Sequence, residues 1–288
     1  MTSLALLLVL SSALIHASWN FVLKRSGGGP GLITAACLLS LVVYAPVVAA
    51  AAWLQRYGFQ PVHLALMFAS GMIHTVYFLL LDRAYRSGGD LSIVYPLARA
   101  TGPLLTVLVA VLLLGERPGP LALAGAVLVG ASALLLTGNP FAWRSSGAGR
   151  AAGFAFLTGL TISLYTVCDK ASVAHWLIPP LVFDWGCNLF RSLVLVPYTQ
   201  RRAPGAIAAA WRDKRATVIV IAILSPLSYL FVLTAMVFTP VSLVAPAREV
   251  SILFAAIMGA HFLKEGDVAR RVVAAAGMAL GVAGLTAG

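Results

Sequence analysis

Two arginines lie deep inside strongly apolar segments of the sequence. Arg99 and Arg248 each fall several residues inside a strongly apolar segment, on the order of 10 Å along a helix. A guanidinium at that depth can hold a carboxylate or a phosphate through two parallel hydrogen bonds. Alternatively, each arginine pairs with a protein group and holds bent helices together. This structural role is favoured for Arg248, because Glu249 and Asp184 are available as partners.

Glu249 and Asp184 are the acidic residues expected to carry a proton. A carboxylate in a low-dielectric cavity can take up and release a proton reversibly. The alternative for Glu249 is a permanent ion pair. Asp184 also shares one helix face with Asn188 and Arg191, at spacings of four and three residues, which is typical of a structural polar stripe between helices.

Aromatic and histidine side chains recur at helical spacing around these charges. A cavity lined with such groups suits small amphipathic solutes, because rings stack on them and hydroxyl or imidazole groups orient them. The alternative is anchoring at the membrane interface, which is expected for Trp53, Trp143, Trp176 and Trp211. The residues assigned to the cavity are His16, Trp19, Asn20, His74, Tyr77, Phe78, Tyr95, Tyr165 and Tyr229.

The segments that carry the two arginines are copies of each other. Ser92–Glu116 and Ser242–Glu265 both begin with Ser, reach Pro four residues later and then Arg, and end with Glu. This shared order indicates an internal duplication. The sequence therefore divides into a first five-helix repeat over 1–138, a linker over 139–149 and a second repeat over 150–288.

Neighbouring segments extend the duplication. His16–Ser26 aligns with Ile162–Ser172, so that Trp19 matches Tyr165 and the two segments share a lysine and a serine. The last helix of each repeat carries small residues four apart, a spacing that lets membrane helices approach closely.

Composition identifies an integral membrane protein. The chain is 60% hydrophobic and 10% charged, whereas soluble domains carry about 25% charged residues. Apolar runs long enough to cross a hydrocarbon core of about 30 Å repeat along the whole length. The fold class expected is all-α, with ten transmembrane helices in two inverted five-helix repeats. The predicted spans are 3–23, 32–53, 62–84, 91–114, 119–137, 150–170, 178–199, 216–237, 242–263 and 269–286.

Several other classes of protein are not supported. The net charge of +11 reflects loop arginines and lysines that set membrane orientation, so no nucleic-acid partner is expected. Zinc-protease, serine-hydrolase and paired-carboxylate motifs are absent from the sequence, as is a phosphate-binding loop for ATP. No catalytic residue, metal site or cofactor is therefore expected.

The distribution of Lys and Arg among alternate loops predicts the orientation. One set of loops contains nearly all of them, including the cluster in 201–215, while the opposite set holds only Arg56, Arg117 and Lys170. The rich set is expected in the cytoplasm, which places both termini outside. Five spans per repeat is an odd number, so the two repeats are expected to be inverted relative to each other.

These features together resemble the drug/metabolite transporter superfamily, of the EamA-domain type. The resemblance rests on ten spans in two halves, a Pro and an Arg early in the fourth and ninth spans, the closing pairs Gly115–Glu116 and Lys264–Glu265, and Trp19–Asn20. It covers nearly the whole chain. The second copy departs from the first where Tyr95 is replaced by Ala245.

The resemblance implies a secondary transporter of the bacterial inner membrane that exports small metabolites by alternating access. Neutral or aromatic amino acids are the expected substrates; drugs, organic cations, and phosphorylated or phosphonate metabolites are the alternatives. The expected partners are a small-molecule substrate and the lipid bilayer, and a monomer suffices because both repeats lie in one chain. The first, third, fourth, sixth, eighth and ninth helices are expected to line the cavity. A channel or an intramembrane enzyme is the alternative from another class.

Overall fold

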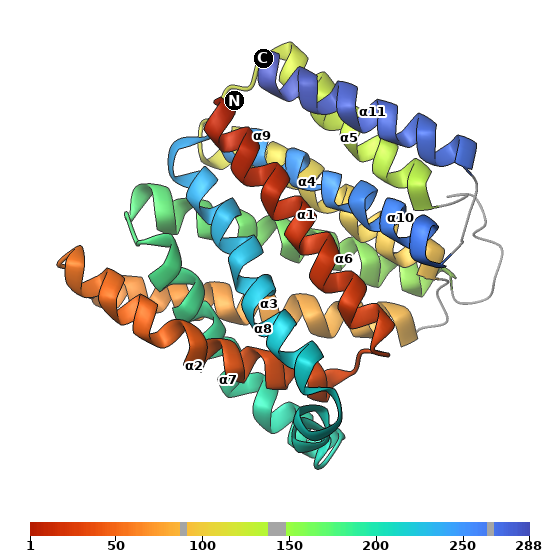
Figure 1. Cartoon of the computed structure of the whole chain (residues 1–288). Helices are drawn as coiled ribbons and strands as arrows, with labels where there is room; N and C mark the ends of the chain where they lie inside the picture. Colours follow the sequence, from red (N-terminus) through yellow and green to blue (C-terminus); the bar gives the residue numbers. More distant parts are fainter. Residues whose placement is uncertain (87–90, 138–147, 264–267) are drawn as a thin grey trace.

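Apolar helices make up nearly all of the chain that this computed structural model describes, which is residues 1–86, 91–137, 148–263 and 268–288 (Figure 1). The predicted all-α membrane fold is confirmed. The helices of the first half are α1 (Ser3–Arg25), α2 (Pro30–Leu54), α3 (Pro61–Arg86), α4 (Leu91–Leu113) and α5 (Pro120–Thr137). Those of the second half are α6 (Ala148–Lys170), a π-helical turn η1 (Ala171–His175), α7 (Pro180–Arg202), α8 (Ala206–Phe238), α9 (Val241–Arg248), α10 (Val250–Leu263) and α11 (Val268–Ala287).

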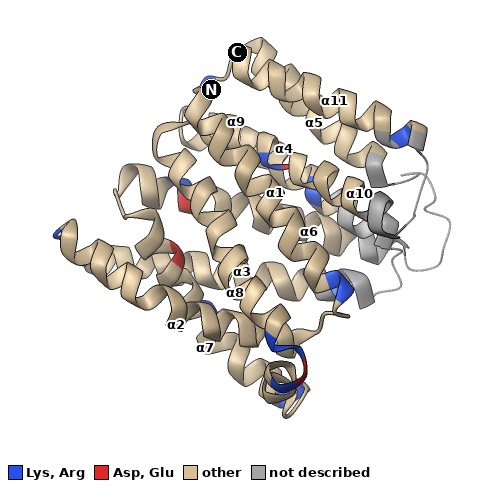
Figure 2. Cartoon of the chain, viewed as in Figure 1, with Lys and Arg blue, Asp and Glu red and all other residues tan. Residues whose placement is uncertain are grey.

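Length and composition qualify several helices to cross a membrane. Ser3–Arg25, Pro30–Leu54, Pro61–Leu80 and Ala206–Phe238 are long and apolar enough. Large apolar side chains face outward, and Val42 and Leu112 are each 70% exposed. In a bilayer these side chains meet lipid instead of water. Figure 2 shows few charged residues among the helices, with Lys and Arg gathered at helix ends and around the connection between α7 and α8.

Two predicted spans differ from the structure. The eighth begins at Ala206 instead of 216, because the polar connection before it folds into a helix that kinks at Lys214. The ninth is divided at Glu249. Pro246 has no N–H, and around it the Glu249 amide bonds to the Pro246 carbonyl at 3.0 Å, while the Ile252 amide bonds to the Glu249 carbonyl at 2.9 Å. These tighter three-residue bonds separate α9 from α10.

Helices pack across the two halves in matched pairs. By their order in each half, α1 is equivalent to α6, α2 to α7 and α3 to α8. Accordingly, α1 packs on α8 and its equivalent α6 packs on α3. In the same way, α2 packs on α8 and its equivalent α7 packs on α3. α4 packs on α6, while α1 packs on α9 and α10. The pairs α2–α7 and α5–α11 join equivalent helices directly. Exchanging the two halves therefore reproduces these contacts, which is the pattern expected of two related five-helix units.

Both termini lie at the same end of the bundle (Figure 1). The Met1 amino group is 3.5 Å from the Thr286 carbonyl oxygen. Most of the predicted linker 139–149 lies outside the described residues.

The glutamate that ends the first duplicated segment has a structural role. Glu116 accepts hydrogen bonds from the amides of Val241 at 2.8 Å and Ser242 at 2.9 Å, at the N-terminus of α9. A carboxylate there pairs amides that lack helical partners and complements the helix dipole. Nearby, the Lys170 ammonium donates to the carbonyls of Met236 and Thr239. The connection between α8 and α9 is thus held from both sides. Glu265, which ends the second segment, lies outside the described residues.

Glycines bring α5 and α11 into backbone contact. A Cβ on Gly125 would collide with the Gly281 carbonyl oxygen and lie 2.9 Å from the Leu285 amide nitrogen. Replacing Gly125 with alanine is expected to destabilise the protein by about 1–3 kcal/mol, because backbone cannot move aside as a side chain can. Thermal unfolding in detergent measures the change. Gly153→Ala is the matched control, since a Cβ there meets nothing within 4 Å. Equal stability of the two variants would contradict this packing.

Candidate functional site

Arg99 lies at the centre of a buried polar cluster formed by three helical segments. Its Nη1 is 3.3 Å from Glu249 Oε1, at the break between α9 and α10. Its Nη2 is 2.9 Å from His16 Nε2 on α1. The side chains of Arg99 and Glu249 are only 12% and 5% exposed. The ninth span breaks where this acid meets the arginine of the equivalent span in the other half.

Arg248, the arginine of the second copy, has a different environment. Its guanidinium carbon lies 5.0 Å from the centroid of the Tyr229 ring on α8, a cation–π arrangement. Its Nε is buried without a hydrogen-bond partner within the described part of the chain, as is Oε2 of Glu249. Glu249 thus pairs with Arg99 and not with Arg248. The sequence favours a protein carboxylate as the partner of Arg248, but Arg248 forms no ion pair among the described residues.

Asp169 on α6 is the buried acid that sequence reasoning missed. The residue is completely buried. Its Oδ1 accepts a hydrogen bond from Ser70 Oγ on α3 at 2.5 Å, and its Oδ2 accepts one from the Tyr229 hydroxyl. The available signal was an acid inside an apolar segment, where the aligned first copy has Leu23. The adjacent Lys170, by contrast, matches Lys24 of the first copy.

Aromatic rings adjoin this acid. The His74 ring stacks on Tyr165 with centroids 3.9 Å apart, and its Nδ1 donates to the Ser70 carbonyl at 2.9 Å. His74 also meets the Tyr229 ring edge to face at 5.7 Å. Tyr77 lies 6.0 Å from Tyr165. These predicted residues therefore form one continuous aromatic group, and Phe78 joins it through Tyr77 at 5.0 Å.

The predicted patch on α1 is divided between two environments. Trp19 meets His16 edge to face at 5.0 Å, and its Nε1 is buried without a hydrogen-bond partner in the described structure. Asn20 instead donates to the His16 carbonyl of its own helix at 2.8 Å. His16 and Trp19 thus adjoin Arg99, whereas the Asn20 amide is used locally.

The stripe on α7 holds α2 in place. Asn188 donates to the Cys37 carbonyl at 3.0 Å and to Ser40 Oγ at 2.8 Å, and accepts from Arg191 at 2.8 Å. Asp184 belongs to a small neighbouring cavity that also includes Tyr44. The structure therefore does not bring Asp184 into direct contact with Arg99 or Arg248.

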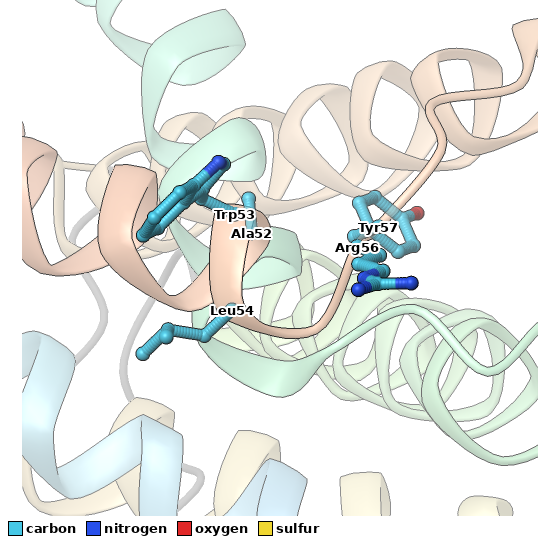
Figure 3. Close-up of a pocket in the computed structure, with 5 residues that line it drawn as sticks. All are labelled: Ala52, Trp53, Leu54, Arg56 and Tyr57. Carbon is cyan, nitrogen blue, oxygen red and sulfur yellow. The ribbon is translucent and has the colours of Figure 1, made fainter.

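One hollow lies away from these residues. It measures about 580 Å³ at the end of α2 and is lined by Ala52, Trp53, Leu54, Arg56 and Tyr57 (Figure 3). Trp53 is 81% exposed, which suits an interfacial anchor better than a binding site. Burial raises the pKa of the nearby Tyr57 hydroxyl, which is 2.6 Å from His63 Nδ1. The side chain of Tyr95 lies outside the described residues.

The central residues form two connected groups at the interface of the halves. They come from α1, α3, α4, α6, α8 and α9 with the adjoining Glu249. One group is His16, Arg99 and Glu249; the other is Asp169, Ser70, His74, Tyr165 and Tyr229, with Arg248 over the Tyr229 ring. Within the described part of the chain, no three His, Cys, Asp or Glu side chains are placed to bind a metal ion. Such a site can bind a charged, partly apolar solute.

Comparison with known proteins gives a family and a fold. Residues 3–138 match the EamA-like transporter family. No curated protein matches the chain. A solved structure titled "Crystal structure of protein" is 19% identical, covers 99% of both chains and has a TM-score of 0.76. At that identity, the likeness concerns the fold alone.

Proposed function

Residues 3–138 match the EamA-like transporter family, part of the drug/metabolite transporter superfamily, and from this premise we propose that the chain is a secondary carrier that exports amino acids. The family match points to a membrane transporter. The proposal adds the substrate class, neutral or aromatic amino acids, and the outward direction across a bacterial inner membrane.

The observation that carries the proposal is the environment of Arg248. Arg248 is partly buried, its Nε is buried without a hydrogen-bond partner, and its guanidinium rests on an aromatic ring and forms no ion pair within the described structure. A partly buried cation of this kind favours an anionic ligand group, because a carboxylate restores both charge balance and hydrogen bonds. The adjoining Tyr229, Tyr165 and His74 rings offer an apolar surface for a side chain.

The alternative ligands fit this environment less well. An organic cation would meet the unpaired positive charge of Arg248, and a phosphate would bring two negative charges to a single unpaired guanidinium. Arg99 is already held by Glu249 and His16. One carboxylate with an apolar side chain is the better match.

Alternating access is proposed to occur between the two halves. The matched helix contacts between the halves support two related units that can rock about a site between them. In keeping with the loop charges, the proposal places both termini outside the inner membrane. A monomer suffices, since both units belong to one chain.

Counterflow in proteoliposomes tests the substrate class. We expect labelled phenylalanine and leucine to exchange saturably, and phenethylamine, which lacks the carboxylate of phenylalanine, to compete at least about 10-fold more weakly. The released label should be chemically unchanged, which separates a carrier from an enzyme. Equal competition by phenethylamine would favour an organic-cation carrier, and exchange of sugar phosphates alone would favour the phosphorylated class. Non-saturable flux would indicate a channel.

A further inference from the structure

We propose that Asp169 is the residue on which this carrier binds its coupling proton, and that Tyr229 connects that proton to the substrate at Arg248. The inference deepens the proposed function, and its second part rests on it. The sequence-based candidates for this role, Glu249 and Asp184, remain predictions.

The contacts of Asp169 suit reversible protonation. Both carboxyl oxygens accept from neutral hydroxyls, Ser70 and Tyr229, and the carboxyl forms no ion pair in the described part of the chain. An ionised carboxylate in a dry interior is costly, and two hydroxyl donors offset only part of that cost. The ionised and protonated forms are then close in free energy, so small changes nearby decide which form is populated.

Glu249 differs from Asp169 because a positively charged side chain lies beside its carboxylate. Its carboxylate has a guanidinium 3.3 Å away, which favours a permanently ionised acid. Asp169 receives no direct cation of this kind. The charged groups that act on it from a distance are Asp184 and, more weakly, Arg248, whose guanidinium lies over the Tyr229 ring.

Titratable and charged groups lie on each of the helices around Asp169. They are His74 on α3, Tyr165, Cys168 and Lys170 on α6, Asp184, Cys187 and Arg191 on α7, Tyr229 on α8, Arg248 on α9 and Glu249 after it. Lys170 is turned away, because its ammonium donates to carbonyls of the α8–α9 connection. Arg191 is held by Asn188.

Tyr229 contacts both Arg248 and Asp169 and so connects the two sites. Its ring face carries the Arg248 guanidinium, and its hydroxyl donates to Asp169. An amino acid whose carboxylate binds Arg248 brings an ammonium group to the same region. The ammonium and a proton then compete for the Asp169 carboxylate, so the proton leaves as substrate binds and returns when substrate is released. That competition is proton–substrate antiport, which drives export when protons flow inward.

The first measurement is a substrate-free infrared titration of the protein in liposomes. We expect the carbonyl stretch of a protonated carboxylic acid to appear and disappear between about pH 5 and pH 9, and to be missing from Asp169→Asn. Asp213→Asn is the matched control, because Asp213 is exposed and paired with Arg212. An unchanged band in Asp169→Asn would overturn the assignment. If that variant does not fold, Ser70→Ala and Tyr229→Phe should each shift the band, because each removes one donor; no shift in either would also overturn it.

The second measurement separates coupling from transport. In wild-type liposomes an imposed pH gradient should drive uphill amino-acid flux. Asp169→Asn should lower this driven flux at least about 10-fold, and any counterflow that it retains should no longer depend on pH. Tyr229→Phe should weaken the dependence on the gradient. Full gradient-driven flux in Asp169→Asn would refute the proton role. If no amino acid exchanges although the Asp169 band titrates, the substrate proposal fails and the proton site stands.

Discussion

Replacing Arg248 with glutamine is expected to lower the affinity for amino acids at least about 30-fold. Truncating one partner of a buried, hydrogen-bonded charge pair costs about 2–5 kcal/mol, and about 1.4 kcal/mol corresponds to tenfold in affinity. The loss should be large because Arg248 forms no ion pair with a protein carboxylate in the described structure, so the substrate carboxylate is its main compensation. Binding to purified protein, followed by scintillation proximity with a labelled amino acid, measures the effect.

Two variants sharpen this test. Arg248→Lys keeps the charge but loses the planar donor pair, and it should bind with intermediate affinity. Arg212→Gln removes an exposed arginine, whose side chain is 78% exposed, and should bind as the wild type does. Wild-type affinity in Arg248→Gln, measured on folded protein, would remove Arg248 from the site. Binding of the decarboxylated amine should be insensitive to the substitution.

Replacing Arg99 with glutamine is expected to destabilise the fold by about 3–5 kcal/mol, the usual cost of removing one partner from a buried ion pair. Glu249 would then lie buried without its guanidinium, and His16 would lose its 2.9 Å contact. The double variant Arg99→Gln/Glu249→Gln should recover most of the loss, because two neutral amides need no charge compensation. Thermal unfolding in detergent across this cycle gives the coupling energy.

The cycle also distinguishes the two arginines. If the single changes at Arg99 and Glu249 were additive, their contact would carry no special weight. Arg248→Gln should affect unfolding much less than Arg99→Gln, because it breaks no ion pair with a protein group in the described structure. A stability loss at Arg248 as large as at Arg99 would indicate a structural role for both.

Most of the fold could be predicted because the bilayer restricts the choices. Apolar length fixes the spans, since unpaired backbone is not tolerated in hydrocarbon. The missed features depend on local polar chemistry. Residues from Ala206 form a helix although the segment reads as a polar loop, and Pro246 divides the ninth span although proline is often tolerated in membranes.

The site was predicted less completely, because residue types do not determine pairing. The sequence made Glu249 available to two arginines, and only the packing of α4 beside α9 brings Arg99 to it. Asp169 was missed because its partners, Ser70 and Tyr229, lie 99 and 60 residues away in the chain. Neither distance leaves a periodic signal.

The exchange of packing between halves has a consequence for biosynthesis. Each early helix finds its main neighbours late: α1 packs on α8 and α10, and α5 packs on α11. The first half therefore leaves the ribosome with its interior faces uncovered, and must stay in the bilayer until the second half arrives. Neither half alone should be a stable folding unit, yet two half-length chains made together should assemble, because the helices themselves supply the contacts between the halves.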